Sequence, residues 1–424
     1  MRPILPWLLL LVSTTSAWAG PDLKALLAAA DRQVDVRQQS ATADEARADA
    51  TAAGLALAPS VSATGGYTRN QYEVILQIPD GQGGYTVDAA ITPKDQLEFN
   101  VTASVPLIDV GAWMRTSAAL ARAKAADATT DETRTRVYRD VVSAYFQHAA
   151  AASLLDAAIS NRDAAASDRE RVLARETVGL ATALDAARAE AAFRRAESQV
   201  ADARQSVRAA VRSLRSRTGL DVDDPPALPD STADEAPLDG WLAEVPGLPS
   251  VAAAEARIKA ARADLAAKGA AFAPSVSAQA GERLTNAAGF GEPAAWSVGV
   301  QARWTLAPAD GASAAARADA VRAADAALEA ARRDAADAIT AAWDRVESLN
   351  ARVKASVAED TASARALDEA RAQFEVGTAT LATVLDVSRD ALTAKATRIQ
   401  AQGDLAAARA DLRLLAGRLD EVTR

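Results

Sequence analysis

The chain has no cysteine and a single histidine, His148, among its 424 residues. The absence of cysteine excludes disulfide bonds and a thiol nucleophile, and one histidine argues against a soft-metal site or a Ser-His-Asp triad. No glycine-rich nucleotide loop or other energy-coupling motif is present either. We therefore expect a protein that is not an enzyme and has no catalytic residue, no metal and no cofactor.

Basic residues are not in excess either. The chain has 47 Lys and Arg residues against 56 Asp and Glu residues, which gives a formal net charge of −9. This balance argues against a nucleic-acid partner, because nothing neutralises phosphates in bulk. Long apolar runs are missing except at the amino terminus, where Arg2 precedes the run from Ile4 to Val12 and Ala17-Trp18-Ala19 follows. We interpret residues 1–19 as a secretory signal peptide rather than an anchor, since the run is shorter than the ~20 residues of a membrane-crossing helix.

What the chain does have is alanine and a duplication. Apolar residues make up 50% of the sequence but aromatic residues only 4%, which is typical of long, closely packed helices. The hexamer APSVSA occurs at residues 58–63 and again at 273–278. We expect a first repeat over 20–218, a Pro/Asp-rich linker over 219–249, a second repeat over 250–416 and a C-terminal tail over 417–424.

Each hexamer opens a segment of alternating apolar and polar residues, which predicts one β-hairpin per repeat, at about 59–107 and about 274–306. The first hairpin is longer by 16 residues, because Leu107 lies 48 positions after Pro59 and Leu306 only 32 after Pro274. The insertion includes QIPDGQGGYTVD, which is polar and contains glycine. We expect it to be a surface loop.

Very long helical patterns follow the hairpins and end at two related signatures, ETVGLATALD at 176–185 and FEVGTATLATVLD at 374–386. Gly179 and Gly377 are the expected hinges of the helix reversals, which commonly need a residue with positive φ. After each reversal a further helix of about 35 residues is expected. Thr182 with Asp185 predicts a capping box for the first, and Thr380 can open the second.

The alternating strands are about 9–11 residues long with one apolar face, which matches tilted strands that cross a membrane. Four strands cannot close a barrel, so several chains would have to share one. Tyr67, Phe99, Trp296 and Trp304 are candidate interfacial anchors. The alternative is that these aromatic residues only pack a soluble sheet.

The order of helix, β-hairpin, long helix, glycine signature and second helix occurs twice with nearly equal spacing. In this order the chain resembles the outer-membrane efflux proteins of the TolC type. The resemblance covers nearly the whole mature chain. It implies a mainly α-helical homotrimer with a small β part, in which each protomer gives four strands to one 12-stranded β-barrel in the outer-membrane lipid. An α-helical coiled-coil tunnel about 100 Å long would continue into the periplasm. The implied partners are a periplasmic adaptor and an inner-membrane RND or ABC transporter.

The resemblance also places the two glycine turns at the periplasmic tip of the tunnel, where the gate lies. The candidate constriction residues are Asp185, Phe374, Thr383 and Asp386. The family's ring uses an Arg and two Asp residues, whereas here Ala379 and Thr383 replace charged members and only Asp386 is retained. We therefore expect a leakier or differently locked gate.

Two function classes remain. The preferred one is a passive exit duct for efflux or type I secretion, and the alternative is a periplasmic coiled-coil scaffold or adaptor that never enters a membrane. Adaptors pair a helical hairpin with compact β-domains, whereas here isolated amphipathic hairpins interrupt the helices, which favours the duct. The sequence does not indicate which substrate passes or which pump supplies it.

A three-fold ring of Asp386 would form an acidic constriction that favours cations and repels anions. We expect Asp386→Ala to lower cation selectivity and to change the conductance of channels in a planar lipid bilayer. If both quantities match those of the unsubstituted channel, the assignment of Asp386 to the ring is wrong.

Overall fold

The structure is a computed structural model that describes residues 22–79, 82–222, 224–229, 232–289, 291–305 and 307–422. The expected signal peptide, residues 1–19, lies outside the described residues. The chain divides into two compact units. Unit 1 comprises Met1–Arg37, Arg134–Glu244 and Asp337–Arg424, and unit 2 comprises Gln38–Thr133 and Val245–Ala336.

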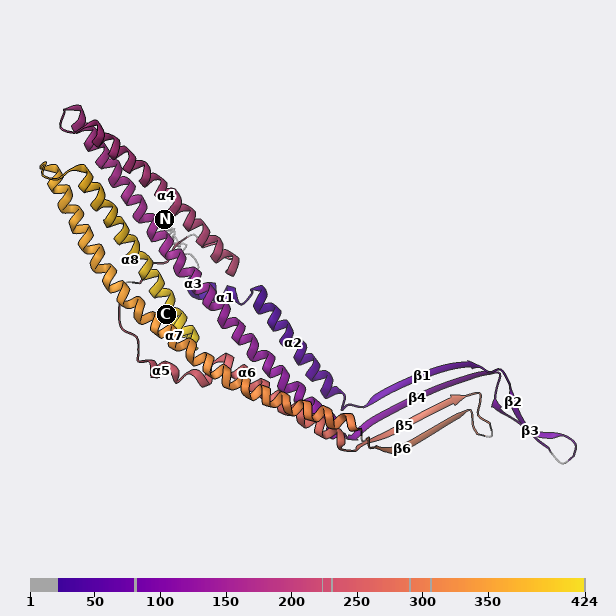
Figure 1. The fold of residues 1–424 in the computed structure, drawn as a ribbon. Helices are drawn as coiled ribbons and strands as arrows, with labels where there is room; N and C mark the ends of the chain where they lie inside the picture. The colour runs from indigo at the N-terminus through magenta and orange to yellow at the C-terminus, as the bar shows by residue number, and fades with distance from the viewer. Residues whose placement is uncertain are drawn as a thin grey trace, which may run out of the picture. The chain divides into compact units, whose positions relative to one another are not determined.

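The same order of elements occurs twice along the chain (Figure 1). The first set is α2 (Val34–Leu55), β1 (Ser60–Arg69), β4 (Asp95–Ile108), α3 (Val110–Thr177) and α4 (Ala183–Thr218). The second set is α6 (Pro249–Gly269), β5 (Ser275–Thr285), β6 (Ala294–Arg303), α7 (Pro308–Glu375) and α8 (Leu381–Leu415). α3 and α7 both contain 68 residues, so the repeats match in their longest element. α1 (Leu23–Ala30) precedes the first set, and the expected C-terminal tail contains a short helix, α9 (Leu419–Val422).

Small side chains hold the helices together. Alanine has the highest helix propensity, and its single methyl group lets helix axes approach closely. In unit 2, Ala50 packs with Ala119 and Ala123. The larger core of unit 1 includes Leu26, Val141 and Leu214, all fully buried. Among the described helices, none combines the length and the apolar character needed to cross a membrane.

Unit 2 contains a four-stranded antiparallel sheet in the order β1-β4-β5-β6 (Figure 1). The chain leaves the first hairpin and returns to extend the same sheet, so that β4 and β5 of different repeats pair through Val101 and Glu282. Strands β1 and β6 are the two edges of this sheet. The mainly helical class with a small antiparallel part, expected from the sequence, is confirmed.

The register places the apolar residues of the four strands on one face, because directly opposed residues point to the same side. Strand by strand, that face carries Val61, Ala63, Gly65 and Tyr67; Leu97, Phe99, Val101, Ala103 and Val105; Val276, Ala278, Ala280, Glu282 and Leu284; and Ala294, Trp296, Val298, Val300 and Ala302. Glu282 is the one charged residue in this set. The opposite face is polar and includes the Glu98–Arg283 ion pair, with 3.0 Å between Oε1 and Nε.

The insertion in the first hairpin is not the plain polar loop that the sequence predicted. It forms two further strands, β2 (Val74–Pro79) and β3 (Tyr85–Thr92), which pair antiparallel in a sheet of their own. The residues of β2, VILQIP, are rich in the β-branched and apolar types that favour strands. Gly83 in the connecting turn has a φ of +92°, a conformation that glycine adopts without strain.

The linker also carries more structure than expected. It contains α5 (Leu238–Leu242) and the 3₁₀ helix η1 (Val245–Gly247), and α6 begins at Pro249. We call residues 233–236 the strap, because they bind side chains from both α7 and α8. The carbonyl of Ala236 accepts a hydrogen bond from the indole of Trp343 in α7 at 3.0 Å. Within unit 1 the strap therefore joins two helices of the second repeat.

The charged residues of the strap extend this attachment. The carboxylate of Glu235 forms ion pairs with Arg409 and Arg413 of α8, at 3.1 and 3.3 Å. The Oδ1 atom of Asp234 accepts a hydrogen bond from Asn350 of α7 at 3.0 Å and pairs with Lys354 at 3.1 Å. The side chain of Glu235 is only 13% exposed, so its ion pairs are shielded from water far more than that of Asp234.

We expect Glu235→Gln to lower the free energy of unfolding by about 1–3 kcal/mol, because it removes the carboxylate that two partly buried guanidinium groups share. The matched control is Lys354→Ala, which removes an exposed partner of the same strap and should cost about 0–1 kcal/mol. Thermal loss of the helical circular dichroism signal measures both. Equal shifts in the two variants would contradict the role of Glu235.

Candidate functional site

The two helix reversals of unit 1 have the same backbone geometry. Gly179 and Gly377 have φ values of +74° and +81°, in the left-handed region. The amide of Leu180 donates to the carbonyl of Arg175 at 2.8 Å, and that of Thr378 donates to the carbonyl of Gln373 at 2.9 Å. Both turns are therefore Schellman-type helix ends, in which glycine avoids the cost that a Cβ atom would bring.

The helices that leave these turns begin at matching N-caps. The hydroxyl of Thr182 accepts the amide of Asp185 at 3.1 Å, and the carboxylate of Asp185 accepts the amide of Thr182 at 3.2 Å. The Thr182 hydroxyl, which donates to the Asp185 carboxylate at 2.7 Å, and then the Thr182 amide lower the pKa of Asp185, so the carboxylate is ionised at neutral pH. In the second turn, the Thr380 hydroxyl accepts the Thr383 amide at 3.3 Å. Asp185 and Thr383 thus occupy the same position in the two repeats.

A single arginine ties one turn to the other. The guanidinium of Arg175, near the end of α3, donates to the carbonyl of Phe374 at 3.1 Å and to that of Glu375 at 2.9 Å. It also lies over the ring of Phe374, with 4.8 Å from Cζ to the ring centroid. Because both carbonyls belong to the last turn of α7, Arg175 neutralises the negative end of that helix. We call this set of contacts the Arg175 clasp.

Further charges and a small apolar cluster surround the clasp. The Asp168 carboxylate pairs with Arg171 of its own helix and with Arg371 of α7, the latter at 3.5 Å. Val172, Ala189 and Leu381 form a small buried apolar cluster, and Phe374 packs against it. A cavity of about 270 Å³ is lined by Asp168, Arg175, Arg371 and Leu381, among others. Within unit 1, the tip of the first helix pair is therefore attached to the tip of the second by apolar packing and by charge.

The residues expected at a constriction lie in different surroundings. The Phe374 ring is covered by Arg175, and the carboxylate of Asp185 is engaged in its capping box. Asp386 lies on α8 with its side chain 70% exposed, 3.9 Å from Nη2 of Arg389. Its carboxylate is thus available to a neighbouring chain or to an ion, and its role in a ring stays a prediction.

The four aromatic residues expected at a membrane interface lie along the sheet of unit 2. Tyr67, Phe99 and Trp296 are on the apolar face, and all are exposed in the single chain. The hydroxyl of Tyr67 donates to Asp95 at 2.8 Å. Trp304 follows the end of β6, and its indole donates to the carbonyl of Phe272 at 3.0 Å. An exposed apolar face of this extent is typical of a surface that contacts lipid or another protein.

Sequence reasoning missed Arg175 and Glu235. Arg175 is adjacent to the first signature, but its partners are backbone carbonyls 199 and 200 positions later, which leave no local pattern. Glu235 lies in a stretch without periodicity, and its contacts depend on how the linker crosses α8. The nearest sequence signal was the glycine turn for Arg175 and the boundary between the repeats for Glu235.

Comparison with known proteins agrees with the duplicated order of helices and strands. The family model described as outer membrane efflux protein matches residues 26–220 and 247–418. Comparison with curated protein sequences gives no significant match. Among solved structures, a membrane protein from Pseudomonas aeruginosa is 22% identical with a TM-score of 0.74, covering 93% of this chain and 93% of that one.

Two further solved structures have the same fold. The MtrE outer membrane channel of Neisseria gonorrhoeae, solved in its open state, is 21% identical with a TM-score of 0.75, and the match covers 96% of this chain and 91% of that one. The outer membrane protein VceC of Vibrio cholerae is 17% identical with a TM-score of 0.72, with 95% of each chain covered. The two family matches coincide with the two sets of repeated elements, and this chain belongs to the outer membrane efflux protein family, as an exit duct of the outer membrane.

Proposed function

We propose that three copies of this chain form a passive duct that carries substrates from an inner-membrane pump and a periplasmic adaptor to the exterior. The observation that carries the proposal is the sheet of unit 2, which has one apolar face, one polar face and two unpaired edges. Unpaired backbone groups cannot remain in lipid, because water is not there to bond them. Three four-stranded sheets joined edge to edge would leave no free edge.

In this arrangement the apolar face contacts lipid and the polar face lines the water-filled interior. The polar face carries both signs of charge, as in the Glu98–Arg283 pair, together with Gln279 and Gln301, whose side-chain amides bond at 3.0 Å. Such a surface keeps water and polar solutes in contact with the wall without selecting strongly for one charge. The energy for transport would come from the partner pump, of the RND or the ABC class.

We further propose that the Arg175 clasp holds the periplasmic tip closed. The sequence predicts a leakier or differently locked gate, because Ala379 and Thr383 stand where the resemblance places charged residues. Arg175 supplies an alternative connection within one chain, since it bonds the end of α7 to the end of α3. Releasing those two hydrogen bonds would free the second-repeat turn to move away from the first.

The number of protomers tests the duct. Protein extracted by detergent from the outer-membrane fraction is expected to be a trimer by light scattering, with the detergent contribution subtracted. A trimer that needs detergent agrees with the shared sheet. A species that stays soluble without detergent would instead favour a periplasmic scaffold.

Conductance tests the clasp. We expect Arg175→Ala to raise the conductance or the open fraction of channels in a planar bilayer at least about twofold. Hydrogen bonds from a charged donor contribute about 1.5–3 kcal/mol, enough to shift a closed-open equilibrium more than tenfold.

The matched control is Arg194→Ala. Arg194 lies on α4 with its side chain 63% exposed, and in the described part of the chain its ion pairs are with Glu190 and Glu197 of its own helix. That variant should conduct as the unsubstituted channel does. The clasp assignment fails if both variants conduct equally, or if Arg175→Ala leaves the conductance unchanged.

A further inference from the structure

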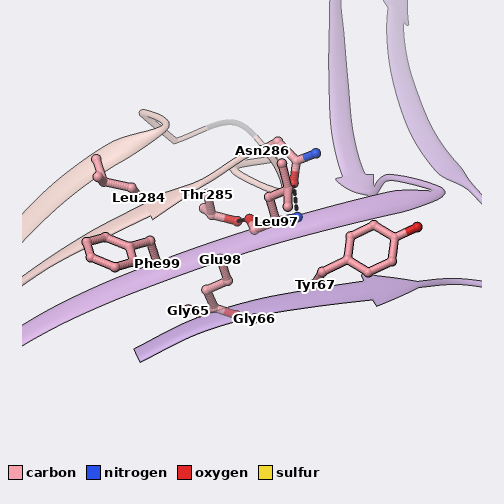
Figure 2. Close-up of a pocket in the computed structure, with 9 residues that line it drawn as sticks. All are labelled: Gly65, Gly66, Tyr67, Leu97, Glu98, Phe99, Leu284, Thr285 and Asn286. Carbon is pink, nitrogen blue, oxygen red and sulfur yellow. Dashed lines mark hydrogen bonds between the residues drawn. The ribbon is translucent and has the colours of Figure 1, made fainter. Parts of the chain in front are cut away.

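The outer end of the β1 edge carries a groove of about 640 Å³ (Figure 2). Its apolar wall consists of Tyr67, Leu97, Phe99 and Leu284. The groove is open because β1 carries two glycines here, Gly65 on the apolar face and Gly66 on the opposite face, so no side chain extends from the strand on either side. A Cβ atom on Gly66 would meet nothing within 4 Å, and one on Gly65 would only touch the ring of Phe99 at 3.6 Å.

The opposite edge of the same sheet carries the complementary shape. On β6, Trp296 is 80% exposed and Val298 is 72% exposed, and both point to the apolar face. Among the described residues, no further strand pairs with the outer side of β6. One edge is thus bulky and the other hollow, and across one chain's sheet Trp296 is level with Ala63, four residues before Tyr67.

We propose that β6 of one copy pairs with β1 of the next so that Trp296 lies opposite the partner's Tyr67 and Val298 lies opposite the partner's Gly65. The Trp296 indole then fills the groove beside the glycines, since a large side chain reaches its diagonal neighbours across strands. This inference rests on the proposed three-copy duct and specifies how its sheets join.

The ladders within one chain fix the starting point for this register. Ser60 on β1 is opposite Ser104, which is opposite Gln279, which is opposite Gly299 on β6. A closed sheet needs each copy to be staggered along its neighbour, so Gly299 must pair with a residue further along the partner's β1. The shift must be an even number of residues, because an odd shift would put the polar residues of one copy on the apolar face of the next.

The overlap of the two edges selects among the even shifts. β1 and β6 contain 10 residues each, and a shift of about four residues pairs all of them, from Ser60 with Arg303 to Arg69 with Ala294. Shifts of about two or six residues leave part of each edge unpaired, which lipid does not tolerate. Three shifts of about four residues give a strand tilt of roughly 35° in a sheet of about 12 strands, within the usual range.

Cysteine cross-linking tests this register directly. The chain has no cysteine of its own, so every disulfide must form between the introduced residues. The proposed register places Gln301 opposite the partner's Ser62 on the water-facing side. The test variant is Ser62→Cys with Gln301→Cys, and the matched controls are Ser60→Cys or Thr64→Cys with the same Gln301→Cys. Disulfides need Cα atoms within about 4.4–6.8 Å, whereas diagonal neighbours lie about 7–8 Å apart.

We expect mild oxidation of the trimer to link the Ser62/Gln301 variant into covalent dimers and trimers about tenfold faster than either control. A link within one chain is not possible, since β1 and β6 are opposite edges of its sheet. Faster linking of a control pair, or no linking in a protein that light scattering shows to be trimeric, overturns the register but not the duct. Loss of the trimer itself in the unsubstituted protein overturns both.

A second measurement tests the contribution of the indole. Trp296→Ala should lower the temperature at which the detergent-solubilised trimer dissociates. Trp304→Ala is the matched control, because the Trp304 indole bonds to its own chain at Phe272. Equal dissociation temperatures for the two variants would show that Trp296 does not fill the partner's groove.

Discussion

The requirement that every backbone N–H and C=O group has a partner governs this molecule. In the helices, the backbone groups bond to one another within each helix. Their side chains therefore need only be small and regularly spaced so that the helices can pack closely. In the sheet of unit 2, the hydrogen bonds of β1 and β6 are satisfied on one side only. Once that sheet enters lipid, the missing bonds must come from another copy of the chain, and assembly becomes a condition for membrane insertion rather than a later event.

The duplication follows the same logic. Each repeat gives two strands to the four-stranded sheet and has two long helices, and the sheet pairs β4 of the first repeat with β5 of the second. The same fold then recurs with different chemistry at its ends. Asp185 in the first turn and Thr383 in the second occupy equivalent cap positions, but only the first closes a reciprocal capping box. The second-repeat helix therefore has a weaker N-terminal cap, next to the turn that Arg175 holds.

Local sequence was sufficient for the features that local physics determines. Period-two alternation predicted the strands of the four-stranded sheet, Gly179 and Gly377 marked the reversals, and Thr182 with Asp185 marked a capping box. The extra strands β2 and β3 were missed because the glycines around Gly83 outweighed the β-branched residues beside them. Arg175 and Glu235 were out of reach for another reason. Their partners are determined by packing between segments far apart in sequence. In the sequence alone, an arginine or glutamate that has such a partner cannot be told from one that has none.

The strap also braces the second helix pair at one place along its length. It binds α7 at Asn350 and Lys354 and α8 at Arg409 and Arg413, so these parts of the two helices are braced against each other. From Lys354 to the end of α7 at Glu375 the helix runs about 30 Å without that brace. A bend of the helix beside the strap would therefore be amplified along the remaining length. A bend of only about 10° beside the strap would displace the turn by about 5 Å, enough to convert a slight change in helix direction into the width of a hydrated ion.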